Sequence, residues 1–77
     1  MQHKGDIQIG RRAASALLER EAQTGVSTRR QLEKMGLDRR TLWAWGTLGH
    51  VPSGDALARM AEVGYDVMYI LTGRRSA

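Results

Sequence analysis

Glycine residues divide this chain into short segments whose apolar residues recur at helical spacing. Gly25, Gly36, Gly64 and Gly73 each follow such a segment, and glycine often ends a helix because it adopts left-handed dihedral angles without strain. The chain carries no credible strand pattern. Helices this short are marginal in isolation. The sequence therefore predicts an all-α fold in which several helices share one core.

Five helices are expected from these signals. The first spans 9–23 and places Ile9, Ala13 and Leu17 on one side, as in an amphipathic helix. The next three end near Gly36, Thr47 and Val63, their N-cap candidates being Ser27 or Thr28, Asp38 and Ser53. The last helix is expected over 66–71.

The 77 residues suffice for one small domain and are too few for a multidomain enzyme. We expect a polar tail at 1–8, one folded domain at 9–73 and a short tail at 74–77. No apolar run approaches the roughly 20 residues that a membrane-spanning helix needs, so no membrane association is expected. The lack of cysteine suits a reducing cytoplasm, where we expect the protein to act.

Basic residues are concentrated in the middle of the chain. Twelve lysines and arginines against eight acidic residues give a net charge of +4. Residues 27–47 contain five basic and two acidic side chains, whereas residues 50–71 contain one basic and three acidic side chains. This distribution favours an anionic partner that contacts the middle of the chain. The alternative is an ordinary solvated face, which charge alone does not exclude.

The sequence lacks the signatures of catalysis and of cofactor binding. His3 and His50 lie far apart and there is no cysteine, so no metal-ligand spacing is present. No serine has an adjacent base or the glycine elbow of an activated nucleophile. The glycines form neither a dinucleotide-binding fingerprint nor a phosphate-binding lysine loop. We therefore expect no enzymatic activity, no cofactor and no bound metal.

Two of the expected helices meet at residues 35–37, Met-Gly-Leu, in the arrangement of a helix-turn-helix. In this motif the second helix enters the major groove of DNA, with its N-terminal residues against base edges. Counted from the turn, the side chains expected to face inward are Leu37, Leu42 and Trp45. Those expected to point outward are Asp38, Arg39, Arg40, Trp43, Ala44 and Thr47.

Four short motifs follow one another between residues 34 and 73. They are Met-Gly-Leu, Arg-Arg-Thr-Leu with Trp45 after it, Gly-His-Val-Pro, and Ile-Leu-Thr-Gly. Together they resemble the DNA-binding domain of phage-type repressors in the lambda repressor and Cro-like (XRE-type) helix-turn-helix superfamily. The resemblance implies a compact five-helix domain that binds operator DNA as a dimer. It also implies a bacterial, nucleoid-associated protein of phage or prophage origin.

Three positions depart from the pattern of that superfamily. Gln31 and Leu32 stand where its members usually carry a hydrophobic residue and then alanine, and the bulk of Leu32 predicts a different angle between helices. Thr28 stands where a phosphate-contacting glutamine is frequent.

The outward residues receive expected roles from this resemblance. The expected base-reading residues are Arg39, Arg40, Trp43 and Ala44. The expected phosphate contacts are Thr28, Arg29, Arg30, Lys34 and Thr47, with the amide of Thr28 assisting. Trp43 can contact a sugar, a thymine methyl or a protein, or it can fold back onto the loop at 48–51, and these alternatives stay open. Asp38 is expected to cap its helix. Ordinary solvated surface is the alternative role for the charged residues.

The last expected helix carries more apolar side chains than one face of a two-turn helix can bury. We expect Val67, Ile70 and Leu71 to face the core, and Met68 and Tyr69 to contact a second copy of the chain. The resulting homodimer would reach two half-sites one DNA turn apart.

The function expected from the sequence is sequence-specific transcriptional regulation at an operator in double-stranded DNA. Repression is favoured over activation because so small a domain leaves little surface to recruit polymerase. The rival hypothesis is a protein-interaction module on the same fold, antitoxin-like or an anti-activator, that binds a protein partner through the Trp43 face.

Overall fold

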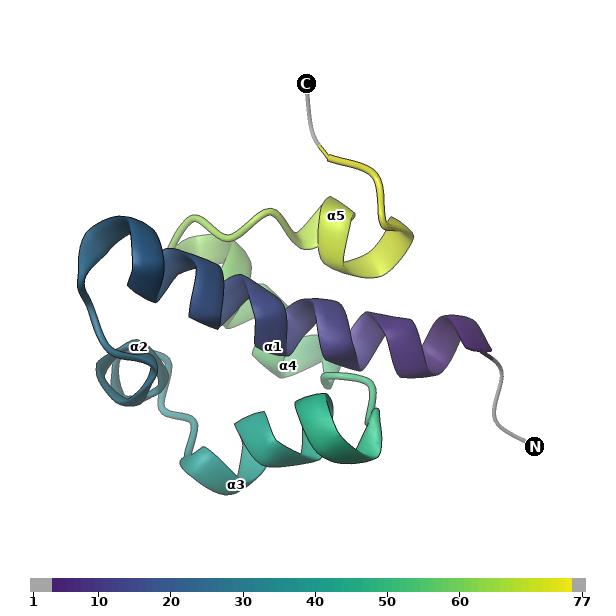
Figure 1. Cartoon of the computed structure of the whole chain (residues 1–77), viewed down its shortest axis with the longest axis horizontal. Coiled ribbons are helices and arrows are strands. Elements are labelled where there is room, and N and C mark those ends of the chain that lie inside the picture. Colours follow the sequence, from purple (N-terminus) through teal and green to yellow (C-terminus); the bar gives the residue numbers. More distant parts are fainter. Residues whose placement is uncertain (1–3, 76–77) are drawn as a thin grey trace.

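A long helix, α1 (Lys4–Thr24), crosses the whole molecule, and the shorter helices pack around it (Figure 1). The computed structural model describes residues 4–75. The shorter helices are α2 (Thr28–Lys34), α3 (Arg39–Trp43), η1 (Ala44–Leu48), α4 (Gly54–Glu62) and α5 (Val67–Thr72). In Figure 1, α5 lies on one side of α1, and α2 and α3 lie on the other. The described residues contain no β-strand, which confirms the all-α prediction.

Side-chain caps begin four of these helices, and three of the four caps were predicted from the sequence. The Ser27 hydroxyl accepts a hydrogen bond from the Arg30 amide at 3.2 Å, so Ser27 and not Thr28 is the N-cap of α2. The Asp38 carboxylate accepts one from the Thr41 amide at 2.9 Å. The caps of α4 and α5 are Ser53 and Asp66. Each cap satisfies an amide that has no partner within its own helix.

The core is built from one buried side of α1 and the inner faces of the other helices. Its largest fully buried side chains are Leu17, Leu32, Met60 and Ile70. Trp45 is only 3% exposed, which confirms its predicted inward position. Leu37 and Leu42 are half-buried and pack against this core, also as predicted.

Helix α1 begins five residues before the predicted start at Ile9, so the expected polar tail at 1–8 is helical from Lys4. Ile7 lies against Gly49, a residue just beyond η1. This tertiary contact supports an additional helical turn, and the apolar spacing of the sequence gave no sign of it. Residues 1–3 and 76–77 of the two predicted tails, with His3 among them, lie outside the described residues.

The third predicted helix changes its winding half-way. It was expected as one α-helix over 39–47, but the chain passes from α3 into a π-helical turn at Ala44. The His50 amide closes this segment by donating to the Ala44 carbonyl at 3.1 Å. A π-turn places one more residue in the turn than an α-helix does. It therefore moves the residues after Trp45 away from the phase that a regular helix would give them.

Backbone-to-backbone proximity fixes η1 on α1. Gly10 is buried, and a Cβ atom there would collide with the carbonyl oxygens of Trp45 and His50. Only a residue without a side chain permits so close an approach. One side of the α3–η1 segment therefore packs on α1, and the other side of that segment is exposed to solvent.

Candidate nucleic-acid interface

Helices α2 and α3 are joined by a tight turn at Gly36. Its φ of +68° lies in the left-handed region, which glycine adopts without strain. The amide of Leu37 donates to the Leu32 carbonyl at 2.9 Å and closes the end of α2. The Arg59 guanidinium on α4 donates to the Met35 carbonyl at 2.7 Å. The turn is thus held by its own backbone and by a neighbouring helix.

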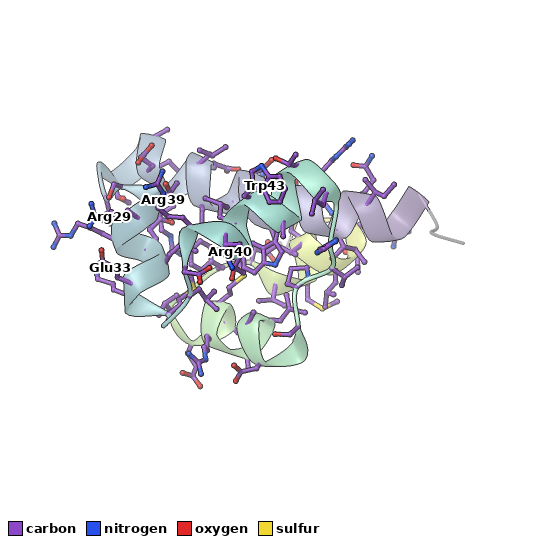
Figure 2. All side chains as sticks on the ribbon, turned by 90° about the horizontal axis from the view of Figure 1, so that it is seen from below. Arg29, Glu33, Arg39, Arg40 and Trp43 are labelled. Atoms are coloured by element: carbon purple, nitrogen blue, oxygen red, sulfur yellow. The ribbon has the colours of Figure 1, made fainter. Side chains whose placement is uncertain are left out.

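The exposed side of α3 presents three of the four residues that the sequence predicted to read bases, and the fourth, Ala44, begins η1. Figure 2 looks onto this helix and shows Arg39, Arg40 and Trp43 along it. All three are exposed, and Trp43 is 55% exposed where Trp45 is 3% exposed. Ala44 is half-buried. The predicted opposition of the two tryptophans is confirmed, because two positions correspond to about 200° around a helix.

The guanidinium groups of Arg39 and Arg40 make no stabilising contact within the described residues. Among the described residues, none forms a hydrogen bond or a close ion pair with either guanidinium. The only carboxylate at the start of α3 is Asp38, which accepts hydrogen bonds from both the amide and the hydroxyl of Thr41. These hydrogen bonds hold the pKa of Asp38 below its ordinary value of 3.8, and the charge of Arg40 contributes in the same direction. Both arginine head groups are therefore available to an external acceptor.

Arg29 lies close to these two arginines. With Leu37 and Asp38, the side chains of Arg29, Arg39 and Arg40 line one shallow groove of about 480 Å³ between α2 and α3. Arg29 also pairs with Glu33 at 3.3 Å, but both side chains are largely exposed, and exposed pairs of this kind contribute little stability. Figure 2 shows Arg29 and Glu33 on α2, beside the α3 residues.

The other predicted phosphate contacts are more dispersed. Arg30 and Thr47 are exposed. Lys34 is exposed but lines a different groove, together with Val63 and Tyr65. The Thr28 amide donates to the Glu21 carboxylate at 2.9 Å, so the expectation that this amide is open to phosphate needs correction. A carboxylate from α1 already occupies it.

Two of the three residues that depart from the superfamily pattern, Gln31 and Leu32, belong to the core. Leu32 is 1% and Gln31 4% exposed. The Gln31 amide nitrogen donates to the carbonyls of Leu17 and Val26, at 3.0 and 2.9 Å, and its oxygen accepts from the Tyr65 hydroxyl. This single side chain joins α1, the α1–α2 connection and the segment before α5.

A groove beside α3 was not foreseen. It has a volume of about 560 Å³, and its lining includes the exposed apolar residues Leu48 and Val51, each 45% exposed, and His50. Trp43 and Arg40 border the same groove. The sequence offers one sign of this groove. Two apolar residues, Leu48 and Val51, follow Trp43 closely in the loop before Ser53. Their outward placement depends on the π-turn.

The last helix only partly matches its prediction. Ile70 is buried and Val67 half-buried, but Leu71 is 38% exposed, so its expected place in the core is wrong. It comes one residue after Ile70, about 100° further around the helix, and so lies at the edge of the buried face. Met68 is exposed as expected. Tyr69 is half-buried, because it packs against the core and the Arg75 guanidinium lies 3.8 Å from its ring centre.

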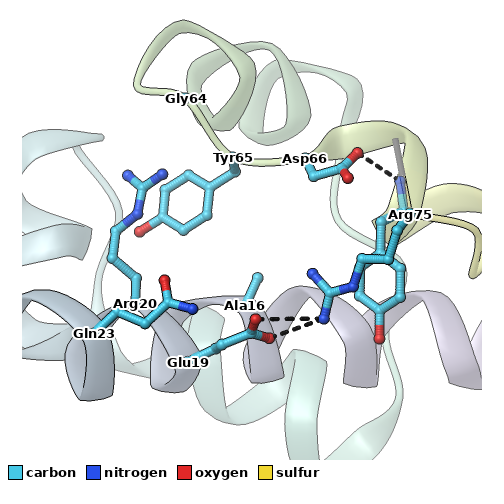
Figure 3. A pocket seen from close by; sticks show the side chains of 9 residues that line it. Ala16, Glu19, Arg20, Gln23, Gly64, Tyr65, Asp66 and Arg75 are labelled. Atoms are coloured by element: carbon cyan, nitrogen blue, oxygen red, sulfur yellow. Dashed lines mark hydrogen bonds and ion pairs between the residues drawn. The ribbon is translucent and has the colours of Figure 1, made fainter. Parts of the chain in front are cut away.

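A smaller cleft of about 160 Å³ lies between α1 and the segment that leads into α5 (Figure 3). Its charged groups already have partners within the chain. Arg75 pairs with Glu19 at 3.1 Å, and this hydrogen bond raises the pKa of Arg75. Arg20 lies 3.7 Å from the ring centre of Tyr65 and donates to the Val63 carbonyl. The cleft is therefore a product of packing between these elements.

Other kinds of site find no support in the described part of the chain. No group of three or more histidine, aspartate or glutamate side chains lies close enough together to hold a metal ion there. None of its helices has the length and apolar character needed to cross a membrane.

Known families and proteins offer no match. The chain fits no protein-family model, and neither curated proteins nor solved structures show significant similarity to it.

Proposed function

We propose that this protein is a sequence-specific DNA-binding transcriptional regulator whose helix α3 enters the major groove. The observation that carries the proposal is the pair Arg39 and Arg40, exposed and without an ion-pair partner among the described residues, at the N-terminal end of the second helix of a glycine-turned helix pair. An arginine can donate two hydrogen bonds to O6 and N7 of guanine, which is the commonest base-specific contact. The resemblance to phage-type repressors supports the same assignment.

Further basic residues, together with Thr47, complete the proposed interface. Arg29 lies in the same groove as Arg39 and Arg40, and Arg30 and Thr47 are exposed on the adjoining segments. Contacts of this kind to phosphates set the position of the protein on the duplex and make binding weaken with salt. Lys34 is the outer member of this phosphate-contacting set, and Thr28 can join it only through its side chain, because its amide is bound to Glu21.

The biological role that follows is occupation of an operator by a homodimer, and hence repression. The protein needs no cofactor and no catalytic activity for this role, because binding alone blocks access to a promoter. It would act in the cytoplasm, at the nucleoid of a bacterial cell, as a phage or prophage regulator of the Cro type does.

Binding to DNA can be tested with a labelled random duplex and with a site obtained by selection from a randomised library. Affinity for both should fall linearly on a plot of log affinity against log salt. Arg39→Ala and Arg40→Ala should each weaken binding to the selected site by about 10- to 100-fold, with a much smaller effect on the random duplex. Arg11→Ala, which removes an exposed arginine from α1, is the matched control. Equal losses for all three variants on both duplexes would contradict a base-reading role.

A second candidate function is the binding of a protein partner, and the apolar groove favours it. Trp43, Leu48 and Val51 expose apolar surface around about 560 Å³ of space. A protein-interaction module on this fold would bind its partner there, and its affinity for random DNA would be weak and almost independent of salt. The salt titration therefore separates the two functions.

A further inference from the structure

The indole of Trp43 does not belong to the hydrophobic core. More than half of its surface is exposed, whereas the neighbouring tryptophan supplies the aromatic anchor of the core. Leu48 and Val51, in the adjoining groove, are also exposed. The exposed surface is therefore divided: the N-terminal end of α3 is charged, and the part that follows it is apolar.

The spacing along α3 relates these two parts to neighbouring base pairs. Arg40 and Trp43 are three residues apart, which places them on one side of the helix and about 4.5 Å apart along its axis. Successive base pairs are separated by about 3.4 Å. A helix that lies along the groove with Arg40 at one base pair thus brings Trp43 to the next one or two.

The base edges offer one apolar group for such a side chain. In the major groove the edges present hydrogen-bond donors, acceptors and the C5-methyl group of thymine. An aromatic ring whose apolar surface would otherwise stay in water gains free energy by covering that methyl group. A sugar, the other DNA group that Trp43 can contact, lies outside the line of base edges that Arg40 is proposed to follow.

We propose that Trp43 reads the C5-methyl group of a thymine one or two base pairs from the guanine bound by Arg40. This inference rests on the proposed function and narrows it to a class of DNA site, in which guanine and a C5-methylated pyrimidine stand close together. Leu48 and Val51 flank the methyl group and exclude water from it. A cytosine at that position lacks the methyl group, and 5-methylcytosine restores it.

The test removes a single methyl group from the DNA. The site selected from the randomised library is synthesised with each thymine replaced in turn by deoxyuridine, which differs from it only in the C5-methyl group. We expect one replacement, next to the guanine, to weaken binding about fourfold, as the loss of one buried methyl group predicts. Cytosine at that position should bind more weakly than 5-methylcytosine.

The variants then assign the effect to one residue. Trp43→Ala should bind thymine and deoxyuridine sites equally and keep its far-ultraviolet circular dichroism, because the side chain is exposed. Leu18→Ala changes another exposed apolar residue, on α1, and should retain the full discrimination. Specific binding that is unaffected by every deoxyuridine would overturn the inference and leave the proposed function intact. Discrimination that persists in Trp43→Ala would also overturn it. If no site is selected and binding does not depend on salt, the proposed function and this inference both fail.

Discussion

At the scale of single residues, buried polar groups in this small domain have defined partners. Gln31 is the clearest example, because its amide group bonds to two backbone carbonyls and to a tyrosine hydroxyl from a distant part of the chain. In the described residues no buried side-chain nitrogen or oxygen lacks a hydrogen-bond partner. Removing one member of such a set is costly, since the other is left buried without water.

Tyr65→Phe should therefore destabilise the protein although it removes only one oxygen. The Gln31 side-chain oxygen loses its donor, and we expect the free energy of unfolding to fall by about 1–3 kcal/mol. The midpoint of urea unfolding, followed by the fluorescence of buried Trp45, measures this change. Tyr69→Phe removes a hydroxyl from a half-buried ring and should have little effect. Similar losses in both variants would show that the Gln31 contact is not the cause.

Asp38 gives the stability of α3 a dependence on pH. Its pKa in the folded protein is lowered by the hydrogen bonds from Thr41, so the ionised form is favoured by folding. This contribution is fully present above the unfolded value of 3.8 and is lost as pH falls through the lower folded value. Asp38→Asn keeps a capping oxygen but does not titrate in this range.

The urea midpoints of the natural protein and of Asp38→Asn should accordingly be compared at about pH 7 and about pH 2. We expect the natural protein to lose its advantage over the variant at the lower pH. An advantage that is unchanged across this range would contradict a stabilising role for the ionised cap.

At the scale of elements, the contact between α1 and η1 determines how α3 is held. The backbones approach closely at Gly10, and the groups in the way of a side chain are carbonyl oxygens, which cannot rotate aside as a flexible side chain would.

Gly10→Ala should destabilise the protein by about 1–3 kcal/mol, the usual cost of overpacking, despite the better helix propensity of alanine. Gly54→Ala is the matched control, because no atom lies within 4 Å of the position of its added Cβ. The melting temperature measured by thermal unfolding should therefore fall clearly for Gly10→Ala, and it should stay the same or rise for Gly54→Ala. A stabilised Gly10→Ala protein would mean that α1 and η1 can separate without loss.

Sequence patterns predicted the elements whose causes are local. Ser27, Asp38 and Ser53 were identifiable as caps because a cap bonds to an amide three residues ahead in the same segment. The opposition of Trp43 and Trp45 follows from helical phase alone. The charged part of the candidate interface was predictable for the same reason.

Features set by tertiary contacts were not predictable in this way. The π-turn at Ala44–Leu48 arises where the chain must both bury Trp45 and lie on α1, and its apolar spacing resembles that of an ordinary helix end. The early start of α1 depends on Ile7 meeting Gly49. The apolar groove beside Trp43 includes Leu48, which lies in the π-turn, so its shape could not be derived from regular helical spacing.

At the scale of the whole molecule, the two sides of the fold differ in character. The α3 side combines Arg39 and Arg40, which have no ion-pair partner among the described residues, with an apolar groove, and the α5 side exposes Met68 at 59% and Leu71 at 38%. Arg12 on α1 donates to the Ile70 carbonyl at 2.9 Å and holds α5 in place. The α5 side is thus the surface that a homodimer could use while both copies keep α3 accessible.

Sedimentation at micromolar concentration should accordingly find a species of about twice the 8.6 kDa mass of one chain. Met68→Asp should yield a folded monomer with weaker binding to a two-part DNA site, because it places a charge in the apolar contact. Tyr69→Asp is the less clean variant, since Tyr69 also packs against the core and under Arg75. If the unchanged protein sediments only as a monomer, this dimer is ruled out. If Met68→Asp is still a dimer, the interface lies elsewhere.

The turn at Gly36 also has an evolutionary consequence. Any other residue at this position would need a backbone φ of +68°, which is strained for a residue with a side chain. Its Cβ would also lie 2.6 Å from a guanidinium nitrogen of Arg59. Relief of that clash would move Arg59 away from the Met35 carbonyl, to which it donates. Positions 36 and 59 are therefore expected to covary among descendants of this chain, so that a lineage which loses the glycine also replaces the arginine.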